Sequence, residues 1–213
     1  SHEFKTPLAA MEGYAALLNA ADIPEELHEY ARRILEGTRQ LSSLTGNILK
    51  LSKLENQEII SEKRHFLLDE QLRQIILSME PVWSKKELEM DLELPETEYY
   101  GNEELMLQVW TNLLSNAVKF TPDGGRISIR IQKTADSVLA EFTDTGIGMS
   151  DEVKTHIFDR FYQGDASRSI EGNGLGLALV HKIITLCGGT IFAESKPGKG
   201  SRFLVCLPSV DSD

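Results

Sequence analysis

The stretch WTNLLSNAVKF, residues 110–120, lies in a long helix that we predict over residues 103–120. Asn112, Asn116 and Lys119 stand at positions i, i+4 and i+7, so they share one face of that helix. Asparagine is a poor residue inside a helix, and two on one face need a reason. Simple exposure is one reason; the other is an oxygen ligand for a hard cation beside an ammonium group for a phosphate.

The segments around this helix alternate between strand and helix patterns. Period-two alternation of apolar residues predicts strands, and 3.6-residue periodicity predicts helices. About five strands interleaved with helices indicate a layered α/β sandwich of roughly 150 residues. The predicted strands cover residues 87–94, 126–132, 137–142, 189–195 and 201–208, and two further helices cover residues 69–83 and 174–189.

The first 56 residues predict a different structure, a helical hairpin. Apolar residues recur at three- and four-residue steps from Phe4 to Leu18 and from Leu27 to Leu51. Such a seam on two helices, without a third local helix, favours a dimer that forms a four-helix bundle. Since the first helix is much the shorter, we expect it to continue upstream of Ser1, which would place His2 midway along the bundle.

The predicted fold class is therefore α+β, with the helical hairpin followed by the α/β sandwich. The hairpin is expected over residues 1–56 and the sandwich domain over residues 66–208. Between them the stretch ENQEIISEKRH is polar, charged and without period, which predicts a hinge over residues 57–65.

Composition narrows the functions that are open to this chain. It has 213 residues with 22 Lys and Arg against 33 Asp and Glu, a formal net charge of −11. This charge argues against sequence-independent binding of nucleic acid and against a basic membrane-surface patch. An anionic ligand would have to be held by local donors.

Two glycine-containing stretches follow predicted strands or precede predicted helices. In DTGIGM, residues 144–149, Asp144 ends a strand, and a carboxylate there can accept a hydrogen bond from an exocyclic amine such as that of adenine. An ordinary turn is the alternative. In GNGLGL, residues 172–177, three glycines stand just before a helix, where free N–H groups and the helix dipole favour phosphate. The aromatic and then polar stretch between the two, residues 157–172, predicts a lid.

Six motifs together resemble one family. SHEFKTPL, NLLSNAVKFTP, DTGIGM, FDRFY, GNGLGLAL and GKGSRF are similar, in this order, to the H, N, G1, F, G2 and G3 boxes of sensor histidine kinases of two-component systems. The resemblance covers the chain from Ser1 to Pro208. It implies a dimeric phosphoacceptor hairpin followed by a Bergerat-type ATP-binding domain.

The resemblance also implies roles for the hairpin residues. His2 matches the phosphoacceptor, Glu3 the neighbouring acid that assists proton transfer, and Thr6 the position associated with phosphatase activity. The implied partners are a second copy of the chain and the receiver domain of a response regulator, which takes the phosphoryl group on an aspartate. Nucleic acid is not an implied partner, and membrane attachment of the whole bacterial protein is expected only through segments upstream of this cytoplasmic part.

ATP and Mg²⁺ are the implied cofactors. Asn116 matches the magnesium ligand, with Asn112 as a further candidate for metal or phosphate, and Lys119 is a phosphate contact. Asp144 matches the acceptor of the adenine amine. The pocket and its lid are implied to involve Gly146, Gly148, Arg160, Tyr162, Gly172, Gly174, Leu175 and Gly176.

Two other functions remain to be weighed against histidine kinase activity. ATPases of the same superfold, such as DNA gyrase, activate water with a glutamate on the corresponding helix, where this chain has Asn112. That difference disfavours hydrolysis. A catalytically inactive scaffold that binds nucleotide and dimerises is the other alternative, and the intact motifs around Asn116 and Asp144 disfavour it.

Overall fold

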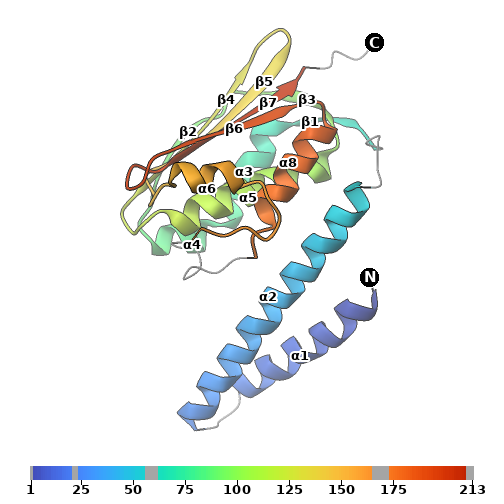
Figure 1. The fold of residues 1–213 in the computed structure, drawn as a ribbon, viewed down its shortest axis with the longest axis vertical. Coiled ribbons are helices and arrows are strands. Elements are labelled where there is room, and N and C mark those ends of the chain that lie inside the picture. Colours follow the sequence, from blue (N-terminus) through green and yellow to red (C-terminus); the bar gives the residue numbers. More distant parts are fainter. Residues whose placement is uncertain (1, 21–23, 56–61, 165–172, 210–213) are drawn as a thin grey trace. The chain divides into compact units, whose positions relative to one another are not determined.

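The structure is a computed structural model and describes residues 2–20, 24–55, 62–164 and 173–209. The chain divides into two compact units, residues 1–56 and 57–213, and each is described by itself (Figure 1). Within the described residues, no helix is long and apolar enough to cross a membrane.

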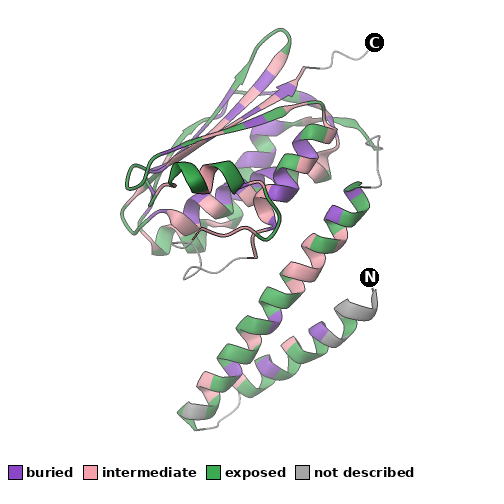
Figure 2. Cartoon of the chain, viewed as in Figure 1, coloured by how far each residue is buried: buried purple, intermediate pink, exposed green. Residues whose placement is uncertain are grey.

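The first unit is a hairpin of two helices, α1 (His2–Ala20) and α2 (Glu25–Glu55), which pack along each other. Its own interior is thin (Figure 2). Leu8, Ala15 and Ala31 are buried, whereas Met11 and Ile34 of the predicted apolar seam are about half exposed, at 55% and 53%. The remaining exposed seam residues are Leu18, Leu27, Tyr30, Leu41 and Ile48.

The second unit has two layers, with the main helices on one face of a five-stranded sheet (Figure 1). The strand order is β2-β4-β5-β7-β6, with β2 and β4 parallel and the other neighbours antiparallel. The strands are β2 (Glu89–Glu93), β4 (Arg126–Lys133), β5 (Ser137–Asp144), β6 (Thr190–Ser195) and β7 (Ser201–Pro208), and all five were predicted. The helices are α3 (Leu68–Ser78), α4 (Glu80–Lys85), α5 (Glu103–Phe120), α6 (Asp151–His156) and α8 (Gly176–Leu186).

Two features differ from the sequence prediction. A small antiparallel pair, β1 (Arg64–Leu67) with β3 (Glu98–Gly101), was missed, and β1 takes in Arg64 and His65, the last two residues of the predicted hinge. The helix predicted over residues 69–83 is interrupted at Met79, and Pro81 lies in the first turn of α4. Since proline cannot donate a backbone hydrogen bond, it starts a new helix more readily than it continues one.

The core lies between the sheet and helix α5. Alternate residues of β4 and β5 face the helices, so Ile127, Ile129 and Phe142 are 0–1% exposed. Trp110 of α5 stacks on Phe142 with 5.8 Å between ring centroids. Each fully buried side chain of this size contributes about 1.5–3 kcal/mol, and this packing fixes which face of α5 remains polar.

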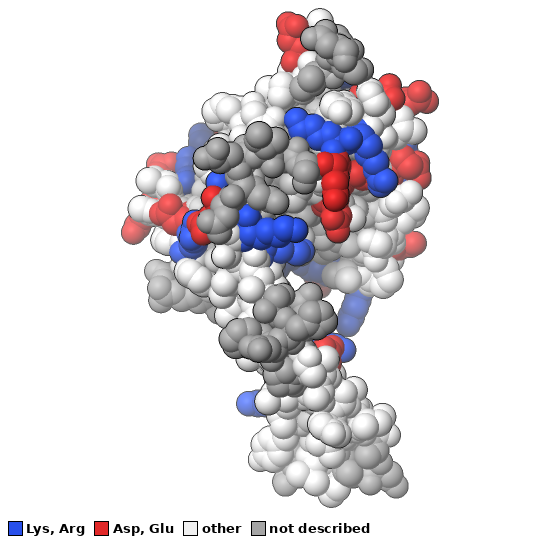
Figure 3. All heavy atoms as spheres, turned by 90° about the vertical axis from the view of Figure 1, so that its right-hand side faces the viewer, with Lys and Arg blue, Asp and Glu red and all other residues white. Residues whose placement is uncertain are grey.

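The opposite face of the sheet carries paired charges. Arg126 contacts Glu89 of the neighbouring strand, Arg130 contacts Asp91, and Arg202 contacts Glu141. On the face of the second unit seen in Figure 3, basic and acidic side chains likewise stand beside one another. Exposed cross-strand pairs of this kind contribute little individually, about 0.2–1 kcal/mol.

Candidate functional site

Helix α5 supplies the first part of the site. Asn102 caps its N-terminus by accepting a hydrogen bond from the Leu105 N–H at 2.9 Å, and the apolar stripe that includes Trp110 is buried against the sheet. Asn112, Asn116 and Lys119 are therefore kept off the core, and all three are partly exposed. Their common face is the one predicted from the sequence.

Asp144, at the end of β5, supplies the second part. It is only 6% exposed, and its Oδ1 accepts hydrogen bonds from the backbone N–H of Gly146 at 2.8 Å and of Ser201 at 3.2 Å. Its Oδ2 accepts none from the residues that the structure describes. Burial raises the pKa of this carboxyl group, and the two backbone donors offset only part of that effect. A further donor at Oδ2 would therefore stabilise the charged form.

The loop after Asp144 joins β5 to the end of α5. The N–H of Ile147 donates to the carbonyl of Phe120, the last residue of α5, at 3.2 Å. A Cβ atom at Gly146 would lie 2.6 Å from both that carbonyl oxygen and Asp144 Oδ1, so any other residue there would push the loop away. The DTGIGM motif is thus held directly against the helix that carries Asn116 and Lys119.

The β6–β7 turn packs on the same loop. Gly200 has φ of +80°, and its missing Cβ would lie 1.8 Å from the Asp144 carbonyl oxygen, so only glycine fits. A Cβ atom at Gly148 would likewise lie only 2.0 Å from the Lys196 carbonyl oxygen. Sequence reasoning missed Ser195, whose buried hydroxyl accepts from the Met149 N–H and donates to the Gly200 carbonyl, both at 2.8 Å. Its position at a strand end before the PGKG turn was the available signal.

The GNGLGL motif meets α5 from the other side. A Cβ atom at Gly176, the first residue of α8, would lie 2.7 Å from Asn112 Oδ1, so the two helices touch at this point. The Asn112 amide nitrogen donates to the Gln108 carbonyl at 2.7 Å, which leaves its oxygen toward Gly176. Leu175 is fully buried, and the Gly174 carbonyl accepts from the Phe161 N–H at 3.0 Å.

The other predicted site residues lie outside α5 and the loop that follows Asp144. Arg160 is exposed, and Tyr162 is partly buried with its ring 5.2 Å from that of His156. Gly172 lies outside the described residues, as does the second half of the predicted lid, residues 165–172. In the first unit, His2 and Glu3 lie in α1 but their side chains are not among those described, and Thr6 is exposed.

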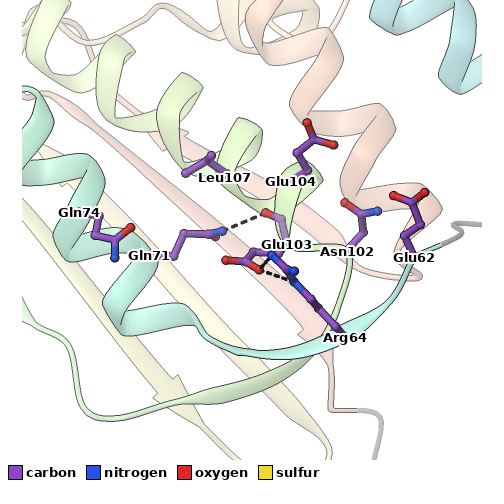
Figure 4. Close-up of a pocket in the computed structure, with 8 residues that line it drawn as sticks. All are labelled: Glu62, Arg64, Gln71, Gln74, Asn102, Glu103, Glu104 and Leu107. Carbon is purple, nitrogen blue, oxygen red and sulfur yellow. Dashed lines mark hydrogen bonds and ion pairs between the residues drawn. The ribbon is translucent and has the colours of Figure 1, made fainter.

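The described surface has two hollows of similar size. One, of about 430 Å³, is lined by Asp144 and Ser201 together with Lys154, Lys196 and Lys199, and Glu194 also lines it. The other, of about 350 Å³, lies at the opposite end of α5 (Figure 4). There the Gln71 side chain donates to the Glu103 carbonyl at 2.9 Å and Arg64 pairs with Glu103. This second hollow contains none of the predicted site residues, and its contacts tie β1 and α3 to the start of α5.

Family models match both units of the chain. Residues 101–211 match "Histidine kinase-, DNA gyrase B-, and HSP90-like ATPase", and residues 1–57 match the "His Kinase A (phospho-acceptor) domain". The chain therefore belongs to the histidine kinase-, gyrase- and HSP90-like ATPase family. Together the two domains define a sensor histidine kinase with a phosphoacceptor hairpin and a catalytic ATP-binding domain, which confirms the predicted family and fold class.

Individual relatives agree with this assignment. The chain is 32% identical to the sensor-like histidine kinase SenX3 of Mycobacterium tuberculosis, over 99% of this chain and 52% of the relative. It is 33% identical to the heme sensor protein HssS of Staphylococcus saprophyticus, over 99% of this chain and 45% of the relative. The chain thus spans about half the length of these curated relatives. The crystal structure of full-length ShkA in complex with AMPPNP superposes with a TM-score of 0.80 at 27% identity, covering 100% of this chain and 45% of that one.

Proposed function

We propose that this chain binds Mg²⁺-ATP in the second unit, phosphorylates itself on His2 and passes the phosphoryl group to an aspartate of a response-regulator receiver domain. The observation that carries the proposal is the convergence of three motifs on α5 and Asp144: Gly146 against Phe120, Gly200 against Asp144, and Gly176 against Asn112. ShkA, a relative of the same fold, has been crystallised with the ATP analogue AMPPNP.

The adenine base is recognised by Asp144 in this proposal. Oδ1 already accepts from two backbone donors, whereas Oδ2 accepts from none of the described residues and is the oxygen proposed to accept from the exocyclic amine of adenine. A buried carboxylate discriminates strongly in favour of a ligand that brings the missing donor, because the alternative is an unpaired buried charge. Guanine presents a carbonyl oxygen at the corresponding position, so it is rejected.

The phosphates and the metal lie along the polar face of α5. The amide oxygens of Asn112 and Asn116 are hard ligands of the kind Mg²⁺ accepts, and Mg²⁺ usually takes one or two protein ligands together with substrate phosphates and water. Among the described residues no cluster of three or more His, Cys, Asp or Glu side chains could hold a metal alone, so this donor set fits a metal that arrives with the nucleotide. Bound Mg²⁺ supplies charge neutralisation on the phosphates. The Lys119 ammonium group would add further positive charge beside the phosphates.

In the transfer step, a neutral ring nitrogen of His2 attacks the γ-phosphorus. A P–N bond forms, the bond between the γ-phosphorus and the β–γ bridging oxygen breaks, and ADP leaves with the electron pair. Glu3 takes the proton of the other ring nitrogen, which stabilises the positive charge that develops on the imidazole. In the second step a carboxylate oxygen of a receiver aspartate attacks the phosphorus, the P–N bond breaks, and the proton held by Glu3 returns to the ring, so His2 leaves as neutral imidazole. Thr6 is proposed to orient water for hydrolysis of the receiver's aspartyl phosphate.

The chain is further proposed to act as a homodimer. The seam side chains of the hairpin, Ile34 at 53% and Tyr30 at 60% exposure among them, would be covered by a second hairpin in a four-helix bundle. In the whole protein these units are proposed to lie in the cytoplasm, with attachment to the bacterial membrane through other segments. Sedimentation of Ile34→Asp against the parent chain tests the dimer, since a charge in the seam should yield monomers.

Incubation with γ-labelled ATP tests the central proposal. We expect an acid-labile, base-stable phosphoprotein from the parent chain and from His28→Gln, a matched control on α2, but none from His2→Gln. Equal labelling of His2→Gln would show that another residue is the acceptor. Release of phosphate without labelling would favour the ATPase function, and nucleotide binding with neither would favour the inactive scaffold.

A further inference from the structure

Lys86 lies in the turn between α4 and β2, and its side chain ends at the C-terminus of α5. The ammonium group donates to the carbonyl oxygens of Val118 at 2.8 Å and Lys119 at 3.4 Å, and also to that of Thr121. Lys86 is partly buried, and its own carbonyl accepts from the Gly124 N–H at 2.8 Å. One residue thus holds both the last turn of α5 and the loop that follows it.

These contacts complete the hydrogen bonding of that helix end. The last carbonyl groups of a helix have no partner within it. Here the Ala117 carbonyl accepts from the N–H and hydroxyl of Thr121, and the Phe120 carbonyl accepts from Ile147. The ammonium group of Lys86 donates to three neighbouring carbonyl oxygens, those of Val118, Lys119 and Thr121. A cation at this position also interacts favourably with the negative end of the helix dipole.

The same turn carries the proposed metal and phosphate ligands. Asn116 and Lys119 lie within the last five residues of α5, and the Phe120 carbonyl anchors the loop that begins at Asp144. The direction of both side chains depends on the path of the backbone between residues 116 and 121. Three of the carbonyl groups on that path are fixed by Lys86.

We infer that Lys86 is a positioning residue for the metal–triphosphate end of the nucleotide site. It acts through α5, since its ammonium group is directed to three backbone carbonyls rather than to a ligand. The inference rests on the proposed nucleotide binding. It assigns to Lys86 the alignment of Asn116 and Lys119, and leaves the recognition of adenine to Asp144.

The test measures the dissociation constant of ATP by calorimetry on the full 213-residue chain, once with Mg²⁺ and once with EDTA, together with the thermal unfolding midpoint. The variants are Lys86→Met, Lys86→Arg and, as a matched control, Lys85→Met on the exposed neighbouring residue. We expect Lys86→Met to weaken Mg²⁺-ATP binding about tenfold and binding in EDTA by less than about threefold. Lys86→Arg, which keeps charge and donors, should recover most of the difference, and Lys85→Met should match the parent. If Lys86→Met does not fold, Lys86→Gln takes its place.

The inference would be overturned if Lys86→Met lost the same ATP affinity in both buffers, unfolded at a lower temperature, and were not rescued by Lys86→Arg. Lys86 would then be only a structural cap of α5. Unchanged Mg²⁺-ATP affinity in Lys86→Met would overturn the inference while leaving the proposed function intact. A parent chain that binds ATP in neither buffer contradicts the proposed function, and the inference with it.

Discussion

Two buried aspartates in the second unit have pKa values that are shifted in opposite directions. Asp69, at the start of α3, is 4% exposed, and Asp144 is 6% exposed, so solvent reaches little of either side chain, although burial in protein weighs more heavily on Asp144. Asp69 accepts from the Thr97 N–H at 2.9 Å and pairs with Arg73. Burial acts to raise its pKa, but these two donors outweigh burial and the pKa is lowered. Asp144 has backbone donors on one oxygen only, and its pKa is raised.

The difference indicates a structural role for Asp69 and a binding role for Asp144. Asp69 has its cation within the fold, so its charge is compensated before any ligand arrives. Asp144 lacks such an ion-pair partner among the described residues, and only its Oδ1 accepts hydrogen bonds from them. A buried titratable group whose environment leaves its charged form incompletely stabilised is a candidate binding group.

The largest expected effect is on nucleotide affinity. Asp144→Asn keeps the shape of the side chain but places an amide where a carboxylate would accept the adenine amine. We expect ATP binding, measured by calorimetry, to weaken about a hundredfold, the upper end for one hydrogen bond to a charged group. Asp69→Asn is the matched control and should bind ATP as the parent does. Equal affinity in Asp144→Asn would remove Asp144 from the nucleotide site.

Asp69→Asn should instead lose stability. The amide oxygen of the new asparagine can still accept from the Thr97 N–H. Its NH₂ group then faces the guanidinium of Arg73, so two hydrogen-bond donors meet and the charge pair is lost. We expect the free energy of unfolding in urea to fall by about 2 kcal/mol. An unchanged value would mean that Asp69 and Arg73 are not coupled, and the contrast with Asp144 would fail.

Gly176→Ala tests whether geometry around α5 matters as much as the carboxylate. The added Cβ would lie 2.7 Å from Asn112 Oδ1, so either the Asn112 amide must turn away from its present position or α8 must shift away from α5. Overpacking of this kind corresponds to about a tenfold loss of ATP affinity. In Gly13→Ala the new methyl group meets nothing within 4 Å, so nucleotide affinity should not change. Parent-like binding by Gly176→Ala would show that the helix junction tolerates movement.

The smallest effect is a difference in pH dependence, on the order of 1 kcal/mol. The folded-state pKa of Asp69 is lowered, so its contribution is present above about pH 4, the unfolded value, and is lost as pH falls through the folded value. The stability deficit of Asp69→Asn should therefore shrink in acid. The folded-state pKa of Asp144 is raised, so its contribution is present below about pH 4 and lost as pH rises. Without nucleotide, Asp144→Asn should thus be more stable than the parent at pH 7, with the advantage disappearing toward pH 4.

Urea unfolding of the parent and both variants between pH 7 and pH 4 measures these trends. Curves for the two variants that move in the same direction relative to the parent would contradict the comparison of the two carboxylates.

Much of the fold was predictable because its elements have strong periodicity. Helix α5 has the predicted bounds, and three strands of the large sheet, β2, β4 and β5, follow the period-two pattern that predicted them. The short strands β1 and β3, with sequences RHFL and EYYG, are too brief to show alternation, and their pairing depends on residues over thirty positions apart.

The candidate site was predictable where chemistry required particular side chains. Gly176 lies against Asn112, and the loop that follows Asp144 lies against the end of α5, while the roles assigned to these residues stay predictions. Ser195 was missed although its position before the PGKG turn was a usable signal, whereas Lys86 was not predicted because an ammonium group that binds backbone carbonyls leaves no pattern in the sequence. Their roles depend on which carbonyl groups the tertiary structure leaves without partners.

The raised pKa of Asp144 also has a consequence for the lifetime of the protein. If ATP supplies the missing donor, the nucleotide acts as a folding cofactor, and saturation at a hundred times its dissociation constant stabilises the native state by about 2.7 kcal/mol. The population of unfolded chains open to proteases would then rise and fall with the adenylate pool of the cell.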